Sequence, residues 1–258
     1  MRYEMASVTH IGNVRKTNQD SVLTCSGFIN GKEAVLAIVA DGMGGLSKGE
    51  LASSLIVEEL QRWWENFTEC EGYTVAVSQG DVKVTIKDIS DAVDNIIYDV
   101  HDKLIEIGNQ DGTKLGTTLS LIILVNNKGL IKHIGDSRVY EIRGGKIRQL
   151  TKDQTYENMM IEKGQMAESE IDPRKNKALV NALGVSKKLY IETLGGVINA
   201  NTLYLLASDG FYQGKENLPE LFDWSSVTDL NIALEYMSSL ILEDSAEDNL
   251  SGILVRAL

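Results

Sequence analysis

Residues 33–53 read EAVLAIVADGMGGLSKGELAS, and this stretch decides the expected fold. The run Glu33–Ala40 is nearly all apolar, which is typical of a strand buried on both faces. It stops abruptly at Asp41-Gly42. From about Lys48 to Trp64 the apolar residues recur at helical spacing, so the pattern predicts an amphipathic helix there. A buried strand, a glycine-rich turn and a helix therefore follow one another, with a carboxylate at the end of the strand.

Outward from this stretch, the predicted strands and helices come in separate groups. A strand is predicted at Ser21–Gly27 and a second helix at Ile89–Ile107. Turn residues such as Gly144-Gly145 separate short apolar runs in the middle of the chain, as consecutive hairpins require. The remaining predicted elements are strands at Thr117–Val125, Leu130–Gly135, Arg138–Arg143, Lys146–Leu150, Leu189–Thr193, Thr202–Ala207 and Leu250–Arg256, and a helix at Leu230–Leu242. This grouping predicts an α+β fold in which two antiparallel β-sheets are stacked with helices outside.

Composition narrows the class of protein. The chain has 258 residues and no proline-rich or Gly/Ser-rich linker, so one domain over residues 1–258 is the simplest expectation. Its formal net charge of −12 argues against a general affinity for nucleic acid or an anionic membrane. No apolar run reaches membrane-spanning length, and the N-terminal segment MRYEMASVTH lacks the apolar stretch of a secretory signal, so we expect a cytoplasmic protein. Cys25 and Cys70 are too few for a disulfide framework.

Aspartates stand at the ends of several predicted strands. Apolar runs lead into Asp41, Asp136 and Asp209, while Asp20 and Asp248 precede the first and the last predicted strand. Several carboxylates can converge at a sheet rim only if something cancels their repulsion. The hard cations Mg²⁺ and Mn²⁺ do so, because they prefer carboxylate, carbonyl and water oxygens. Each aspartate alone has a simpler explanation, since Asp-Gly is a common turn dipeptide, so the residues by themselves leave both interpretations open.

Several segments together carry a resemblance to a known family. They are GNVRKTNQDS (Gly12–Ser21), VADGMGGLSKGELAS (Val39–Ser53), GTTLS (Gly116–Ser120), HIGDSRVY (His133–Tyr140), LTKDQT (Leu150–Thr155), LASDGF (Leu206–Phe211) and EDNLSGILV (Glu247–Val255). They occur in the family's order across essentially the whole chain, and DGMGG and IGDSR are specific. The sequence thereby resembles the PPM, or type 2C, family of metal-dependent protein serine/threonine phosphatases in its compact bacterial form. The fold that this resemblance implies, an α-β-β-α sandwich, agrees with the element pattern.

The resemblance implies a metal centre built from the aspartates. Asp41 would bridge two core ions, Mn²⁺ or Mg²⁺, with the carbonyl of Gly42 helping at one of them. Asp209 and Asp248 would complete the protein ligands of one ion. Asp20 would lie beside the other ion and act through water.

Two further residues take roles by the same resemblance. Asp136 is similar to the family residue that helps hold a third, weaker ion, and Arg15 would hold the substrate phosphate through its planar fork of donors. The implied reaction is hydrolysis of phosphoserine or phosphothreonine by in-line attack of a metal-bridging hydroxide, since bound cations lower the pKa of water. The implied partners are phosphoprotein substrates of a cognate serine/threonine kinase, and we expect a monomer that binds neither nucleic acid nor membrane.

The chain departs from the family pattern at three positions. Gln19 stands where many relatives carry glutamate, which removes a negative charge next to Asp20. Gln154 and Asp172 replace common histidines within Lys152–Lys188, a polar stretch that resembles the family's flap. Beside the active phosphatase, these departures keep open a second hypothesis, a catalytically silent binding module with the same fold. A third hypothesis is an α+β domain whose aspartates only form turns.

Overall fold

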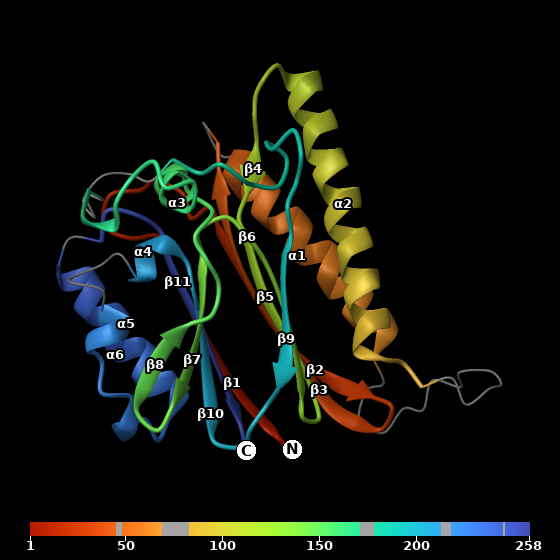
Figure 1. Cartoon of the computed structure of the whole chain (residues 1–258), viewed down its shortest axis with the longest axis vertical. Helices are drawn as coiled ribbons and strands as arrows, with labels where there is room; N and C mark the ends of the chain where they lie inside the picture. The colour runs from red at the N-terminus through yellow and green to blue at the C-terminus, as the bar shows by residue number, and fades with distance from the viewer. Residues whose placement is uncertain (45–47, 69–82, 171–177, 213–217, 245) are drawn as a thin grey trace.

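The computed structural model describes residues 1–44, 48–68, 83–170, 178–212, 218–244 and 246–258. Two antiparallel sheets face one another, and helices cover the outer face of each sheet, as Figure 1 shows. The predicted α+β fold of two stacked sheets flanked by helices is confirmed.

The first sheet has its most buried strand next to its edge strand β2. Its strands run in the order β2 (Asp20–Ile29), β3 (Lys32–Met43), β5 (Leu119–Val125), β6 (Lys128–Ile134) and β9 (Glu192–Val197), and β4 (Gly116–Thr117) pairs with the end of β3. β3 is buried from Ala34 to Ala40, because it has a strand on each side and packed layers on both faces. The β2–β3 hairpin places Asp20 directly opposite Asp41.

The second sheet joins the two ends of the chain. Its order is β1 (Tyr3–His10), β11 (Leu250–Ala257), β10 (Thr202–Ala207), β7 (Arg138–Arg143) and β8 (Lys146–Gln149). β1 pairs with β11 along its whole length, from Tyr3 opposite Ala257 to His10 opposite Leu250. β1 is absent from the predicted strands. It is an edge strand in which only Ala6 is fully buried, so its sequence lacks a marked apolar pattern.

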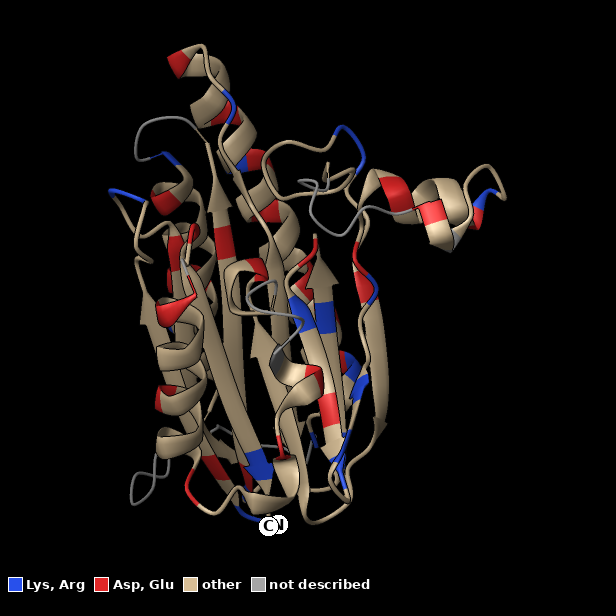
Figure 2. Ribbon diagram, turned by 90° about the vertical axis from the view of Figure 1, so that its left-hand side faces the viewer, with Lys and Arg blue, Asp and Glu red and all other residues tan. Residues whose placement is uncertain are grey.

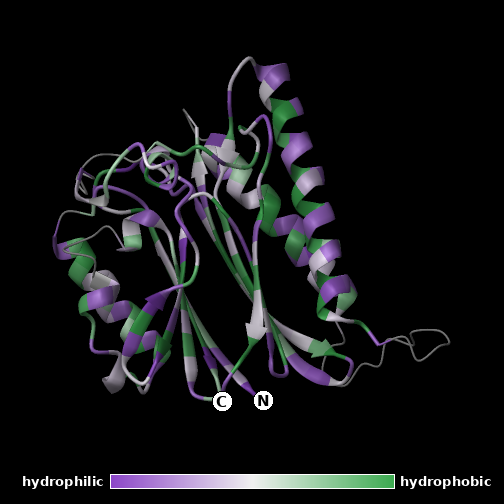
Figure 3. Cartoon of the chain, in the orientation of Figure 1, coloured by the Kyte–Doolittle hydropathy of each residue, from purple (hydrophilic) through white to green (hydrophobic). Residues whose placement is uncertain are grey.

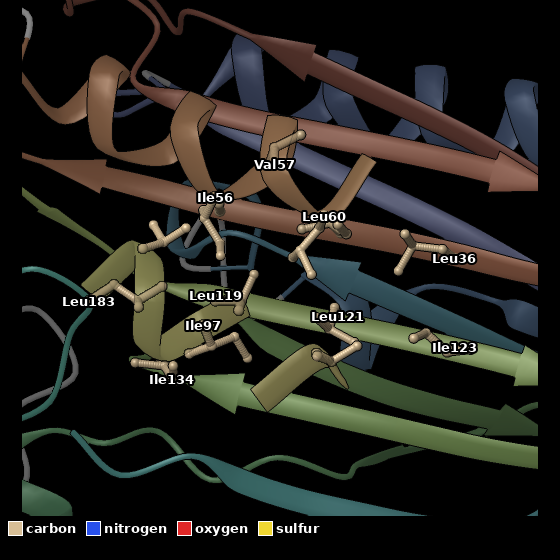
Figure 4. Close-up of a cluster of buried hydrophobic side chains, with 14 of the residues drawn as sticks. Leu36, Ile56, Val57, Leu60, Ile97, Leu119, Leu121, Ile123, Ile134 and Leu183 are labelled. Carbon is tan, nitrogen blue, oxygen red and sulfur yellow. The ribbon is translucent and has the colours of Figure 1, made fainter. Parts of the chain in front are cut away.

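Apolar side chains pack on both faces of each sheet. One buried cluster fills the space between the sheets and includes Val39, Leu206 and Ile253. A second lies between the first sheet and the helices α1 (Lys48–Phe67) and α2 (Ile86–Asp111), and Figure 4 shows its side chains meeting from helix and strand. A third lies between the second sheet and α6 (Leu230–Glu243). Figure 3 shows the same layering, with hydrophobic faces of the helices turned toward the sheets.

The longest helix has defined ends. The Thr85 side chain accepts a hydrogen bond from the N–H of Asp88, and the Asp88 carboxylate accepts one from the N–H of Thr85, so a capping box starts α2. Gly112, in the left-handed conformation, ends it. The short helices are α3 (Tyr156–Glu162), α4 (Asp209–Tyr212) and α5 (Leu218–Leu221), with 3₁₀ turns at Glu168–Glu170 and Trp224–Ser226. Within the described ranges, no helix has the length and apolarity needed to cross a membrane.

One predicted strand is displaced in the structure. The prediction placed it at Leu189–Thr193, whereas β9 runs over Glu192–Val197. Leu189 instead packs with the cluster beneath α1 and α2, so its apolar character reflects that contact and not a strand. β9 is an edge strand containing Gly195 and Gly196, and glycine gives no strand signal.

Candidate metal centre

One cavity at the rim of the sandwich collects most of the residues assigned to the site. It has a volume of about 490 Å³ and lies where β3 ends and the loops after β6, after β10 and before β11 meet. Its lining includes Arg15, Asp41, Gly42, Asp136, Asp209 and Asp248, together with Gln19, Thr118 and Asn249. Asp20 is not part of this lining, but it lies opposite Asp41 in the β2–β3 pair.

The backbone of Asp41 is held by two threonines at the junction between β4 and β5. Its N–H donates to Thr118 Oγ1 at 3.0 Å, and its carbonyl oxygen accepts from the N–H of Thr118 at 2.8 Å and from Thr117 Oγ1 at 3.0 Å. A Cβ at Gly42 would lie only 2.1 Å from the carbonyl oxygen of Gly49 in α1. Only glycine therefore lets the end of β3 pass so close to the helix, which fixes the Asp41-Gly42 peptide at the cavity.

Asp20 is buried and only partly satisfied. Its side chain Oδ2 accepts a hydrogen bond from the Ser208 hydroxyl at 2.9 Å, while Oδ1 has no hydrogen-bond partner among the described residues. Burial raises the pKa of Asp20 to about 7, and the charges of Asp209 and Asp248 add to this effect. A buried carboxylate oxygen without a donor is costly, so this position favours either a proton or a cation nearby.

Asp41 and Asp209 interact with each other and with the other carboxylates of the cavity. Burial, and then the charges of Asp20 and three further aspartates, raise the pKa of Asp41 well above its usual value. Burial and the charge of Asp248 raise the pKa of Asp209, while a hydrogen bond with Asp41 and the charge of Arg15 oppose the rise. Mutual effects of this kind require the carboxylates to lie close together. At neutral pH these carboxyls therefore favour either bound protons or a bound cation.

Asn249 brings Asp248 and Arg15 into one place. Its Nδ2 donates to the carbonyl oxygen of Ile11 at 2.8 Å, and its Oδ1 accepts from the N–H of Gln19 at 2.8 Å. These bonds hold the loop that carries Arg15 against the start of β11. Arg15 Nη2 then lies 2.5 Å from Asp248 Oδ2, in an ion pair that remains about half exposed to solvent.

Asp136 follows a sharp turn at Gly135. The φ angle of Gly135 is 102°, and a Cβ there would lie 2.7 Å from the Thr118 side chain, so the turn requires glycine. The hydroxyl groups of Thr118 and Ser137 are hydrogen-bonded at 2.7 Å. Thr118 thus contacts both the backbone of Asp41 and the turn that carries Asp136, which keeps these two aspartates at one cavity.

The donors of the cavity suit a hard divalent cation. Carboxylate oxygens and the Gly42 carbonyl are the ligands that Mg²⁺ and Mn²⁺ prefer. Arg15 contacts an oxygen of Asp248, and Ser208 contacts an oxygen of Asp20. In the described part of the chain, no three His, Cys, Asp or Glu side chains converge closely enough to hold an ion. Ion binding therefore requires these side chains to turn toward the ion.

The family follows from comparison with known proteins. A family model described as Protein phosphatase 2C matches residues 9–254. The chain belongs to the protein phosphatase 2C family. This match spans every aspartate of the cavity, and it confirms the resemblance carried by the sequence motifs.

Similar proteins of the protein phosphatase 2C family are named as phosphatases. Protein phosphatase PhpP of Streptococcus pneumoniae is 28% identical over 210 residues, which cover 80% of this chain and 78% of PhpP. Serine/threonine phosphatase stp of Listeria monocytogenes is 29% identical over 206 residues, covering 78% of this chain and 75% of stp. The predicted class, a protein serine/threonine phosphatase with phosphoprotein substrates, is confirmed. These relatives give no support to the hypothesis of a silent module.

Solved structures share the fold. The serine/threonine phosphatase of S. agalactiae matches with a TM-score of 0.82 and 25% identity, over the full length of both chains. The catalytic domain of PstP, solved in complex with two manganese ions, matches with a TM-score of 0.76 and 23% identity, covering 98% of this chain and 97% of PstP. At this level of identity the likeness to PstP shows a shared fold.

Two of the departures from the family pattern lie at described positions. Gln19 Nε2 donates to the Gly44 carbonyl oxygen at 3.3 Å, beside the cavity that Gln19 lines. Gln154 donates from its N–H to the Gly135 carbonyl oxygen at 2.7 Å, and its Oε1 accepts from the N–H of Gly135 at 2.9 Å. Gln154 therefore supports the turn that precedes Asp136. The third departure, Asp172, lies outside the described residues.

Sequence reasoning missed the polar residues that position the aspartates. Thr117, Thr118, Ser208 and Asn249 received no role, although each lies in a segment that carries the family resemblance. Their hydrogen bonds link segments far apart in the chain, such as Ser208 with Asp20. A weak signal existed, since a hydroxyl or amide residue directly precedes or follows the aspartate in LASDGF and EDNLSGILV.

Proposed function

We propose that the chain removes phosphate from phosphoserine and phosphothreonine residues with Mn²⁺ or Mg²⁺ held at the rim cavity. One observation carries the proposal: Asp41, Asp209 and Asp248 come from three distant segments and line a single cavity together with Arg15. The cavity thus combines ligands for hard cations with a donor for phosphate. Membership of the protein phosphatase 2C family supports the same activity.

In this proposal Asp41 would serve both core ions, and the Gly42 carbonyl would help at one of them. Asp209 and Asp248 would complete the protein ligands of one ion, and Asp20 would act at the other through water. The raised pKa values of Asp20, Asp41 and Asp209 support these roles. Carboxylates that hold protons in the absence of metal release them to a cation, because binding requires the ionised form.

The proposed reaction is in-line displacement of the serine or threonine oxygen from phosphorus, with water as the nucleophile. Bound divalent cations supply a water of lowered pKa and neutralise charge on the phosphoryl oxygens. Arg15 holds the phosphate through its fork of N–H donors. Its side chain is 51% exposed and pairs with Asp248, so phosphate binding requires Arg15 to exchange that partner. Asp136 is the proposed ligand of a third, weaker ion, at the turn that Thr118 holds.

The proposal extends to the whole chain. We take residues 1–258 as one phosphatase domain, which the pairing of β1 with β11 supports because it joins both ends of the chain in one sheet. Residues 152–188 are proposed as a flap beside the site, and Leu179, from this stretch, lines the cavity. The proposed substrates are phosphoproteins made by a cognate serine/threonine kinase, and the proposed active form is a monomer.

A phosphothreonine peptide is the direct test. We expect hydrolysis with added Mn²⁺ or Mg²⁺, none after thorough chelation, and recovery when the ion is restored. Arg15→Ala should raise KM for the peptide by about tenfold or more, because Arg15 acts on phosphate. The affinity for Mn²⁺, measured by calorimetry, should not fall, because the substitution frees Asp248 from its ion pair. Turnover that survives chelation would overturn the proposal. An absence of Mn²⁺ binding at millimolar concentration would favour the silent module.

A further inference from the structure

A second cavity lies in the helical layer over the second sheet, and it shares no lining residue with the metal centre. Its volume is about 440 Å³, and it lies between α6 and residues 221–229. We name it the α6 groove, and its main lining residues are Leu221, Phe222, Asp229, Ile232, Tyr236 and Leu240. Figure 1 shows α6 at the outer side of this layer.

Helix α6 is apolar on the side that the chain leaves open as well as on the side that packs. Leu230 and Met237 are buried against the second sheet. Ile232 and Tyr236, one helical turn apart, are 65% and 56% exposed, and Leu221 across the groove is 64% exposed. Exposed apolar patches on a helix that is also buried on its other side mark interaction sites.

The stretch of chain that forms the groove carries only negative charge. Residues 218–255 contain no Lys, Arg or His. Asp223 and Asp229 line the groove, and Glu235 is exposed on α6. The nearest following cation, Arg256, donates to two backbone carbonyls of the segment opposite α6. Figure 2 views the molecule from the side on which α6 lies, with acidic residues in red.

These features define the chemistry of the missing partner. Apolar walls require apolar side chains, and the acidic stretch attracts Lys and Arg while it repels phosphate and anionic lipid headgroups. Successive positions Ile232, Tyr236 and Leu240 form a straight apolar stripe along α6, which matches the side-by-side packing of a second helix. We propose that the α6 groove binds a basic amphipathic helix of a partner protein, with apolar residues in the groove and Lys or Arg facing Asp223, Asp229 and Glu235.

A model peptide tests the groove without knowledge of the natural partner. The probe is a fluorescein-labelled peptide of leucine and lysine, about 18 residues long, with the leucines on one helical face. The control peptide has the same composition with the leucines scattered, so that it keeps the charge and loses the stripe. We expect fluorescence anisotropy to show saturable binding of the first peptide only, and weaker binding as salt is raised.

Variants locate the binding on the protein. Ile232→Ser combined with Tyr236→Ser should weaken binding at least about tenfold. Glu235→Gln should weaken it a few-fold, at low salt only. Tyr98→Ser on α2, where Tyr98 is 47% exposed, is the matched control and should leave binding unchanged. The far-UV circular dichroism spectrum and the midpoint of urea unfolding should be close to those of the unaltered chain in all variants and report correct folding.

Other outcomes overturn the proposal. Equal binding of the two peptides, or binding that survives the double substitution, would mean that only general charge attraction operates. Saturable binding of the chain to phosphatidylglycerol vesicles, lost in the double variant, would assign the groove to a membrane. Self-association in sedimentation that the double variant abolishes would assign it to a second copy of the chain. Each readout is independent of whether the metal centre hydrolyses phosphopeptides.

Discussion

The buried carboxylate of Asp153 and the aspartates of the rim cavity differ in how their negative charge is neutralised. Asp153 accepts hydrogen bonds from Arg138 Nε at 2.9 Å and Nη2 at 2.7 Å, and the Arg138 guanidinium lies 3.7 Å from the centre of the Tyr212 ring. Asp20 and Asp41, by contrast, have no Lys or Arg ion-pair partner within the described residues. The Ser208 hydroxyl donates to the Asp20 carboxylate, and Thr118 holds the backbone of Asp41. We call Arg138 and Asp153 the closed group, because the arginine neutralises the carboxylate. We call Asp20, Asp41 and Asp209 the open group, because their cavity can accept an added cation.

The difference separates a structural acid, Asp153, from the acids that we propose as metal ligands. A buried carboxylate with a bidentate arginine keeps its charge without help from solvent. Carboxylates that face one another raise each other's pKa, as Asp20, Asp41 and Asp209 do, and remain ready to exchange protons for metal. The Arg138 side chain is 12% exposed and that of Asp153 3% exposed, so burial alone does not distinguish the two groups.

The largest expected effect is in the open group. Asp209→Asn should lower turnover of a phosphothreonine peptide at least about 1000-fold, or about 4 kcal/mol of barrier, because a ligand charge is lost. The same substitution should leave the metal-free protein as stable or more stable at pH 8, since it removes a carboxylate that its neighbours repel. Enzyme assays with Mn²⁺ and urea unfolding without metal measure the two effects.

Asp91→Asn, at an exposed pair with Lys87 on α2, is the control and should change neither quantity. If Asp209→Asn strongly destabilised the metal-free chain, Asp209 would be part of a closed arrangement, and the contrast between the two groups would fail.

A substitution in the closed group should instead lower the stability of the protein. Asp153→Asn leaves the buried Arg138 charge without its partner, which costs about 3–5 kcal/mol of unfolding free energy. Urea unfolding at pH 8 measures this loss, with the exposed Lys87–Asp91 pair again supplying the matched control. A loss no larger than that of Asp91→Asn would show that solvent reaches Arg138, and burial of the pair would then explain nothing.

A pH series extends the comparison to His133, next to the closed group. Its Nε2 lies 3.2 Å from the carbonyl oxygen of Lys152, and its Nδ1 lies 2.9 Å from the Ser120 hydroxyl. Burial lowers the pKa of His133 to about 4. A depressed pKa contributes to the free energy of unfolding, and this contribution is fully present above about pH 6.5, the pKa of histidine in the unfolded chain. Below that pH the unfolded chain binds a proton that the folded chain does not, so about 3 kcal/mol is lost as the pH falls toward about 4.

The raised pKa of Asp20 changes stability in the opposite direction. Its contribution to the free energy of unfolding is present at low pH and is lost as pH rises through about 7.

The variant His133→Gln isolates the contribution of the histidine. The stability difference between this variant and the unaltered chain should shrink steadily from pH 6.5 to pH 4. Curves that stay parallel over that range would show that His133 is accessible to protons in the folded state.

How far the sequence predicts the fold depends on burial. The buried part of β3 is predicted correctly, because burial on both faces leaves an unbroken apolar run at Ala34–Ala40, although the strand continues to Met43. The edge strands β1 and β9 are missed or displaced, since few of their side chains are buried and β1 pairs with the far end of the chain. Local pattern carries no information about so distant a partner.

The candidate site, too, could be predicted from the sequence only in part. Its aspartates follow from ordered motifs, and the structure places five of the assigned residues and Gly42 around one cavity. The supporting contacts do not follow from spacing. Asn249 acts on the loop of Arg15 through Ile11, and Thr118 acts on Asp41 across two strands. Arg138 and Asp153 lie in motifs that carry the resemblance, yet only the structure shows that they form a closed pair.

The smallest expected effect concerns Gln154, which links the two groups. It directly follows Asp153 and exchanges hydrogen bonds with Gly135, the residue before Asp136, while its Oε1 also accepts from Asn181 Nδ2 at 2.6 Å. Gln154→Met has a similar volume but no acceptor, so it should cost about 1–2 kcal/mol of unfolding free energy. Because the turn of Asp136 is then less well held, the Mn²⁺ concentration that gives half-maximal activity should rise a few-fold. Gln154→Glu keeps the acceptor at Oε1 and should restore that concentration. If Gln154→Glu raised the Mn²⁺ concentration for half-maximal activity as much as Gln154→Met does, the acceptor at Oε1 would not be what holds the turn. The open group would then be independent of the closed group.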